Sequence, residues 1–260
     1  MQNIHPSPTR KTNPDFPRRL RKRGEDNLKW LKAEIGSRRG TSIVLIGGKD
    51  NLAFRLRAAQ AHVRDTFTPS HWSHCFLLFG LERSVAATPI YEISLDPPNG
   101  FGFPGSTNGM QEGMLERYAS AERYPNIAVI QVPVDVAKAA DTLRRFPQQR
   151  SILDAVDLMV RWLAFGWGAG SAGNPLFEGF GIPSAAMIEL VCNAAGYDIT
   201  PNTPSRASTP ESLWQATKWW WEFPRTGKEH PTGSFTIGDA MGDQTQSHWA
   251  RRLQSYARTR

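Results

Sequence analysis

A histidine at the start of an apolar segment is the first candidate for chemistry in this chain. His74 follows a polar run, residues 70–73, and opens the apolar run 75–79, which ends at Gly80. The pattern predicts an imidazole at the edge of a strand, and an imidazole titrates near neutrality, so it is suited to proton transfer. The chain has six histidines, and most protein histidines only make ordinary hydrogen bonds. The case for His74 therefore depends on its neighbours.

A carboxylate lies one predicted hairpin after His74. Glu92 is in the middle of a predicted strand, between Tyr91 and Ile93. A buried carboxylate needs a partner, because an unpaired buried charge is costly. If the two strands pair, Glu92 can orient the imidazole and stabilise its charged form, as the acid does in nucleophile–histidine–acid triads. The alternative is a solvated strand residue without a catalytic role.

A serine at a predicted helix start is the third candidate. Ser184 follows Pro183, and the helix is expected to run to about Ala195, before Gly196. The stripe at helical spacing that would face the core contains Ser184, Met187, Ile188, Val191 and Ala195. A side-chain oxygen there lies beside unpaired N–H groups and the positive end of the helix dipole, which stabilise a developing anion. Ser184 is therefore either a nucleophile or an ordinary N-cap.

The strands and helices that must position these residues do not follow a regular strand–helix alternation along the chain. Strands are predicted at residues 42–48, 74–79, 89–95 and 127–134, and helices at 51–63, 136–145, 152–165 and 184–195. The strands come mostly before the long helices. This order favours an α+β domain, an antiparallel sheet with helices packed against it.

The charge of the chain is concentrated at its N-terminal end. The chain of 260 residues has a formal net charge of +7, and residues 1–40 contain eleven Lys/Arg and four Asp/Glu. The other residues balance at 20 against 20. We therefore expect a basic, flexible leader at 1–40, a domain that contains the three candidate catalytic residues at 41–223 and a polar extension at 224–260. A neutral body argues against nucleic-acid binding.

Several other classes of protein are disfavoured by composition. No apolar stretch follows the basic residues, so no Sec signal peptide is expected and the chain is expected to start in the cytoplasm. The longest apolar region, 152–167, contains Asp154, Asp157 and Arg161, which makes it too polar for a membrane span. Two cysteines, Cys75 and Cys192, show no zinc-binding spacing. No metal or cofactor is expected.

Taken together, these motifs resemble the circularly permuted papain-like fold of the NlpC superfamily, which includes permuted amidases and lecithin:retinol acyltransferase-like enzymes. The resemblance covers about residues 41–215. A Ser-His pair enters an apolar strand at residues 73–80, a polar residue follows at Glu92, and a helix opens at residues 184–188. A Thr-Pro-acid-x-Leu element follows at residues 209–213. The resemblance implies an antiparallel sheet packed against helices, with His74 activating residue 184, Glu92 orienting His74, and N–H groups near 184 binding the oxyanion.

The chain departs from the family at the nucleophile, which is normally a cysteine. Serine at 184 is far less acidic than cysteine. It is explained by an engineered Cys-to-Ser change, by a natural serine variant, or by a pseudoenzyme that kept the pocket. Another alignment, which matches residues 189–191 to the Glu-Leu-Val of the family, puts Met187 at the nucleophile and favours the pseudoenzyme. Cys192 is expected in the core, and Cys75 on the opposite side of its strand from His74.

The function implied is acyl transfer or hydrolysis at an amide or ester carbonyl. The leading hypothesis is an amidase or peptidase of the cysteine-hydrolase type that acts on bacterial cell-wall peptidoglycan, as a toxin or effector delivered to a target cell by a secretion system. Its partners would be a peptidoglycan peptide or acyl substrate and an immunity or secretion-system protein. One alternative is a lipid-directed acyltransferase or phospholipase that contacts membrane surfaces through its aromatic-rich segments at 162–167 and 219–223. The other is a non-enzymatic, pocket-bearing binding module.

Overall fold

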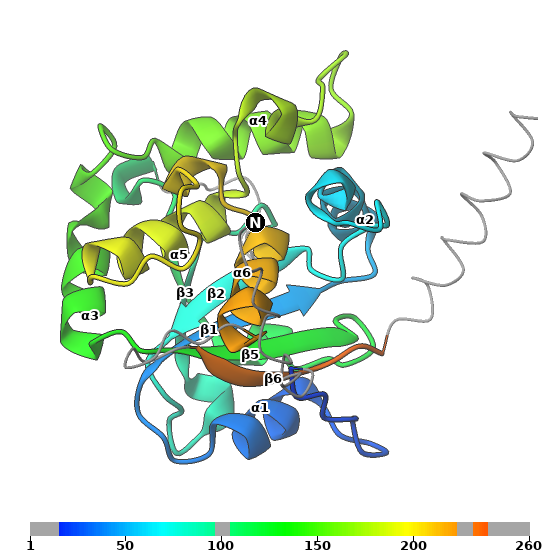
Figure 1. Ribbon diagram of the computed structural model, residues 1–260, viewed down its shortest axis with the longest axis vertical. Coiled ribbons are helices and arrows are strands. Elements are labelled where there is room, and N and C mark those ends of the chain that lie inside the picture. Colours follow the sequence, from blue (N-terminus) through cyan, green and yellow to red (C-terminus); the bar gives the residue numbers. More distant parts are fainter. Residues whose placement is uncertain (1–15, 97–104, 223–230, 239–260) are drawn as a thin grey trace, which may run out of the picture.

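A computed structural model describes residues 16–96, 105–222 and 231–238. Its centre is a six-stranded antiparallel sheet with the strand order β4-β3-β2-β1-β5-β6. Helices cover both faces of the sheet, with α1 on one face and the longer helices on the other (Figure 1). The predicted α+β class and antiparallel sheet are confirmed.

The predicted strands and helices are present, with shifts of a few residues at their ends. The strands are β1 Thr41–Gly47, β2 His74–Leu78, β3 Pro89–Glu92, β4 Gln111–Met114, β5 Asn126–Val132 and β6 Thr232–Thr236. The α-helices are α1 Asn27–Ile35, α2 Asn51–Ala59, α3 Val136–Arg145, α4 Ala155–Trp167, α5 Pro183–Ala194 and α6 Pro210–Glu222. Strands β4 and β6 and helices α1 and α6 were not among the predicted elements.

The central strands bury both of their faces, so they separate two apolar cores. Successive side chains of a strand point to opposite faces. In β1, Ile43 and Leu45 join the larger core beneath the helix layer, while Val44 and Ile46 join the smaller core against α1. This explains why all seven residues of β1 are buried and why its sequence shows no polar alternation.

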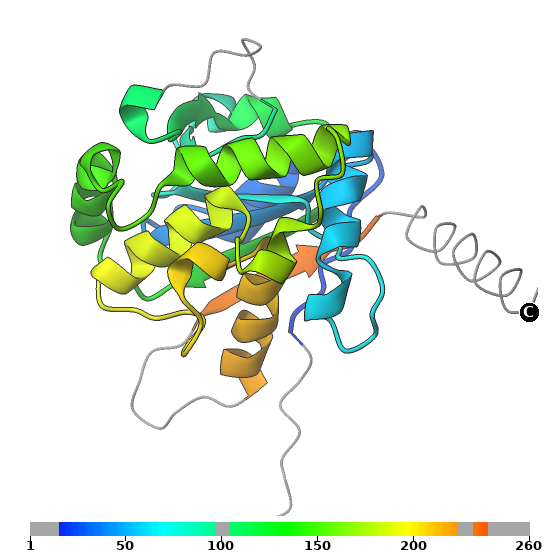
Figure 2. The ribbon, with the colours of Figure 1, turned by 90° about the horizontal axis from the view of Figure 1, so that it is seen from above.

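Helix α5 lies beside α4 in the helix layer (Figure 2), and its apolar residues belong to the larger core. All ten residues from Pro183 to Cys192 are buried. Small residues at 184–186 allow close approach to the sheet, and the Ser184 hydroxyl is hydrogen-bonded to the backbone of Cys75 in β2 and of Ile93 just after β3. The N-cap is Ile182, so the alternative that Ser184 is an ordinary N-cap is wrong.

The ends of the domain differ from the expected boundaries. Residues 16–40 belong to the fold, because Trp30, Leu31 and Ile35 of α1 are buried against the sheet. Lys29 and Lys32 of the same helix are exposed, so the net charge of this segment gave no sign of its apolar stripe. Strand β6 likewise lies within the expected polar extension, where it pairs with β5. The rest of both predicted tails, residues 1–15, 224–230 and 239–260, lies outside the described residues.

No helix in the described part of the chain is long and apolar enough to span a membrane. Helix α4, which contains the longest apolar region, instead buries Leu158, Met159 and Trp162 in the larger core.

Candidate functional site

His74 is held at the first position of β2, opposite Ile46 of β1. The preceding Ser73 fixes this strand end, since its backbone N–H donates to the Ile46 carbonyl at 2.8 Å and its hydroxyl accepts from the N–H of Gly48 at 3.1 Å. The histidine side chain is 14% exposed, which leaves one part of the ring in contact with solvent. An apolar strand and a polar anchor together therefore present the imidazole at the end of the interior strand β2.

Glu92 is completely buried behind this imidazole. Its carboxylate lies 2.6 Å from Nε2 of His74, 3.0 Å from a guanidinium nitrogen of Arg117 and 2.5 Å from the hydroxyl of Tyr118. Both Arg117 and Tyr118 come from the short 3₁₀ turn Leu115–Tyr118 that follows β4. The structure thus brings His74 and Glu92 together and adds two residues that the sequence reading did not find.

These contacts determine the proton positions in the cluster. Burial alone would raise the pKa of Glu92, but the hydrogen bond and charge of His74, the charge of Arg117 and the bond from Tyr118 together hold it below its ordinary value. Burial and the neighbouring carboxylate raise the pKa of Tyr118 well above its ordinary value. An ionised carboxylate only accepts hydrogen bonds, so Nε2 of His74 carries a proton and donates it. In the neutral ring, Nδ1 is then an acceptor.

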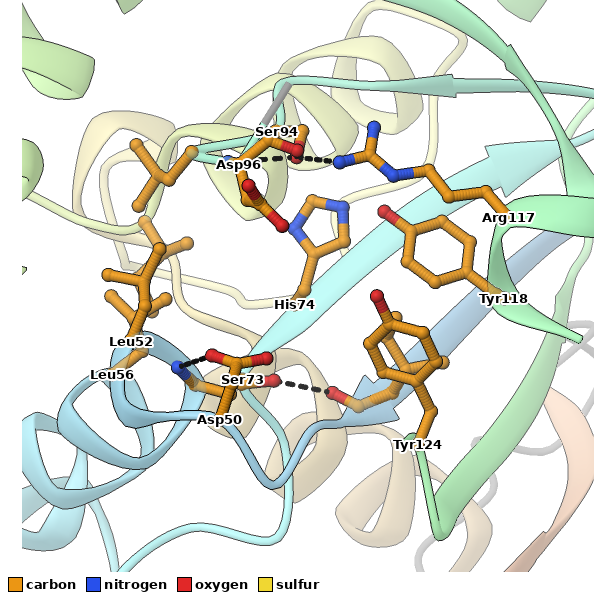
Figure 3. Close-up of a pocket in the computed structure, with 14 residues that line it drawn as sticks. Asp50, Leu52, Leu56, Ser73, His74, Ser94, Asp96, Arg117, Tyr118 and Tyr124 are labelled. Atoms are coloured by element: carbon orange, nitrogen blue, oxygen red, sulfur yellow. Dashed lines mark hydrogen bonds between the residues drawn. The ribbon is translucent and has the colours of Figure 1, made fainter. Parts of the chain in front are cut away.

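His74 lines a pocket of about 50 Å³ at this end of the sheet. Figure 3 shows the imidazole in the middle of the pocket, with Arg117 and Tyr118 on one side and Leu52 and Leu56 on the other. Within the described residues, no protein group is hydrogen-bonded to Nδ1 of His74. The pocket has room for a few water molecules or one small polar group, and it offers that group a hydrogen-bond acceptor between an apolar wall and a polar wall that contains Arg117, Asp50 and Asp96.

Ser184 does not line this pocket. Its hydroxyl donates to the Cys75 carbonyl at 2.5 Å and accepts from the Ile93 N–H at 3.1 Å. Strands β2 and β3 pair at Leu77 and Tyr91, and the same alignment sets Cys75 opposite Ile93. The hydroxyl therefore stands between the two strands where their next backbone hydrogen bond would be.

The other candidates for a nucleophile are also in the core. Met187 is completely buried and does not line the pocket. Cys75 and Cys192 are buried, and burial raises the pKa of both thiols far above its ordinary value. Since a thiolate is the reactive form, neither thiol is poised for reaction.

The Thr-Pro-acid-x-Leu element is tied to the segment that precedes His74. Thr209 and Ser212 cap the start of α6 through reciprocal hydrogen bonds. Glu211 is buried, and its carboxylate accepts from the Ser70 hydroxyl at 2.6 Å. The Glu211 N–H donates to Gln60, whose amide in turn donates to the Trp72 carbonyl. This downstream element therefore fixes the loop that delivers His74, although it is 135 residues or more away in the sequence.

Comparisons with protein-family models, with curated proteins and with solved structures give no match to this chain. The chemistry of the site is therefore argued from its own geometry.

Among the described residues, no group of three or more His, Cys, Asp or Glu side chains is arranged to hold a metal ion. What the pocket itself supplies is a hydrogen-bonded histidine, whose outer nitrogen can bind a donor group or accept a proton.

Proposed function

We propose that this chain is a binding module with the scaffold of a permuted papain-like hydrolase, and that its ligand docks on His74. The observation that carries the proposal is the position of Ser184, whose hydroxyl joins the Cys75 carbonyl of β2 to the Ile93 N–H just after β3, and which does not line the pocket. A serine nucleophile needs a free hydroxyl within hydrogen-bond reach of its base. The two partners of Ser184 are backbone groups, and a missing nucleophile is the pseudoenzyme alternative raised by the sequence.

The ligand group that fits the pocket is a small hydrogen-bond donor, such as an amide N–H or a hydroxyl of a peptide. Nδ1 of His74 accepts that hydrogen bond, because Nε2 donates to Glu92. The leucines of the pocket, Leu52 and Leu56, can pack against an aliphatic part of the ligand. Peptides of bacterial peptidoglycan have both features and are the first ligands to assay.

A binding experiment tests this proposal directly. Calorimetric titration of peptidoglycan peptides should show binding to the wild type, at least a tenfold weaker affinity in His74→Ala, and unchanged affinity in Ser184→Ala. Glu112→Gln, which changes an exposed carboxylate on β4, serves as the control. Absence of both binding and turnover in the correctly folded wild type would overturn the proposal.

The second candidate is an enzyme, an amidase or peptidase that acts on the same peptides, or an acyltransferase or phospholipase that acts on lipids. The specific observation in its favour is the 2.6 Å contact between His74 and Glu92, which would prepare Nδ1 to deprotonate a water molecule or a substrate hydroxyl. An antibacterial effector delivered by a secretion system would be one setting for this chemistry.

Turnover in the same variants separates the mechanisms. Release of peptide fragments or fatty acid by the wild type, lost in His74→Ala and kept in Ser184→Ala, supports a hydrolase that uses water. Loss in both variants, with activity restored or raised in Ser184→Cys, supports the triad that the sequence predicts. Peptide binding without product in any variant supports the binding module.

A further inference from the structure

A second and larger cavity lies between α6, β6 and the N-terminal segment of the described chain. Its volume is about 520 Å³, and it shares no lining residue with the pocket of His74. Figure 1 shows α6 lying over β6, where the rings of Trp214 and Phe235 are in contact, 5.1 Å between centroids. The volume is within the range of small-molecule sites in proteins.

One wall of this cavity is built from aromatic rings. The ring of Trp214 is packed edge-on against that of Phe16, with 5.1 Å between the ring centroids. The centroids of the Phe16 and Trp221 rings are 5.6 Å apart. Phe235 completes the wall. Phe16 and Trp214 are almost fully buried, at 6% and 5% exposed, so the wall is part of the packed core. It provides a fixed surface for the apolar body of a ligand.

The polar part of the cavity is cationic. Arg18, Arg64 and Lys218 line it together with His71, and no carboxylate residue of the described chain does. Arg64 has a counter-charge, since Glu211 lies 3.7 Å from its guanidinium. Arg18 and Lys218 have no ion-pair partner among the described residues: Arg18 donates to the Ile237 carbonyl, and Lys218 lies 5.8 Å from the centre of the Trp214 ring.

From this arrangement we infer that the cavity binds an amphiphilic anion, a carboxylate or phosphate group attached to an apolar body. The aromatic wall contacts the body, and Arg18 and Lys218 bind the anionic group. Charge-assisted hydrogen bonds from arginine and lysine favour these oxyanions over neutral groups. The inference does not depend on the function proposed for the His74 pocket. Free fatty acids or alkyl phosphates and anionic lipids share this chemistry.

Calorimetric titration with decanoate and decyl phosphate, below their micelle concentrations, tests the inference. We expect saturable binding of both anions, at least tenfold weaker in Lys218→Glu and weaker in Arg18→Glu. Lys218→Met keeps the apolar stem of the side chain and loses its charge. It should also bind the anions more weakly, which separates the loss of charge from a folding defect in Lys218→Glu. Lys138→Glu, an exposed change on α3, should leave the affinity unchanged.

Two further arms identify the source of the ligand and the role of charge. Equal binding of decyltrimethylammonium would overturn the inference, because the cavity would then select only the apolar chain. Adsorption to phosphatidylglycerol vesicles without binding of either free anion would also overturn it. The protein would then be attracted to the charged vesicle surface without taking an anion into the cavity. Binding of the free anions and also of vesicles, both weakened by Lys218→Glu, supports the inference with an anionic lipid as a source.

Discussion

Glu92 is the residue whose removal should most disturb the candidate site. It is fully buried and accepts from His74, Arg117 and Tyr118. Removing one partner of a buried ion pair leaves the other charge without compensation. We expect Glu92→Gln to lower the free energy of unfolding at pH 7 by about 3 kcal/mol, measured by urea denaturation. Glu112→Gln, on the neighbouring strand but exposed, should change it by less than about 0.5 kcal/mol.

The pH dependence of that difference follows from the lowered pKa of Glu92. A carboxyl group with a lower pKa in the folded state stabilises the fold above its unfolded value of about 4.5, and this contribution is lost as the pH falls through the folded pKa. The stability difference between the wild type and Glu92→Gln should therefore shrink below about pH 4.5. A difference that stays constant down to pH 3 would contradict the assigned charge of Glu92.

The hydrogen bonds of the Ser184 hydroxyl lead to a separate prediction about stability. Ser184→Ala removes both hydrogen bonds between α5 and the β2–β3 pair, so it should cost about 1–3 kcal/mol of unfolding free energy. The amide of Ile93 should also exchange its hydrogen faster, because it loses its acceptor. Ser171→Ala, at an exposed position, is the matched control. Unchanged stability together with lost activity would instead point to a nucleophile.

At the scale of elements, the buried Glu189 links α5 to the turn that follows it. Its carboxylate accepts from the N–H groups of Ile199 and Thr200. Burial is the main cause that raises the pKa of Glu189 to about 7, and Asp198 adds to the effect. The folded chain therefore binds a proton that the unfolded chain releases above about pH 4.5.

The sign of this effect is opposite to that of Glu92. Because Glu189 holds its proton more tightly in the folded state, its contribution to stability is lost as the pH rises toward 7. Unfolding free energies measured at pH 5.5 and pH 8 should show a fall in the wild type of about 2 kcal/mol that is smaller in Glu189→Gln. Glu178→Gln, at an exposed carboxylate, should keep the slope of the wild type. Equal slopes in all three proteins would contradict the prediction.

The sequence predicted the elements of the domain better than the contacts between them. Periodicity and turn residues located β1, β2, β3, β5 and the helices α2 to α5, because each is a local pattern. Strand β4, with the sequence Gln-Glu-Gly-Met, is half exposed and contains a glycine, so it has neither the alternation nor the β-propensity of a typical strand. The edge strand β6 is equally inconspicuous.

The candidate site could be predicted only in part for a related reason. A carboxylate within a predicted strand calls for a partner, and this reasoning led to the His74–Glu92 pair. The choice of Arg117 and Tyr118 as the other partners depends on the long-range pairing of β3 with β4, which composition does not reveal. The helical stripe correctly assigned Ser184 to the buried face of α5. It could not show that the hydroxyl would be hydrogen-bonded to the backbone of Cys75 and Ile93.

At the scale of the whole molecule, the basic N-terminal segment covers one face of the central sheet. Helix α1 buries Trp30, Leu31 and Ile35 on the second face of the sheet. A chain that starts at residue 41 should therefore expose that face, bind a hydrophobic dye and lose cooperative unfolding, whereas the full chain should unfold in one transition. Trp30→Ala should cost about 3–5 kcal/mol, and Lys32→Ala on the same helix much less. Cooperative unfolding of the shortened chain would restore the predicted boundary at residue 41.

The same architecture constrains the order of events during synthesis. Arg18 bonds to Ile237, 219 residues later, and pairs with Phe235 of the edge strand. The ribosome synthesises the N-terminal segment first, and its partner strand β6 is synthesised only after almost the whole domain. The contacts between the two therefore cannot form until late in synthesis. Contacts between such distant residues slow folding, because a long loop must close before they form. The aromatic wall of the larger cavity, which joins Phe16 to Phe235, is therefore completed last, and a nascent chain cannot bind a ligand there.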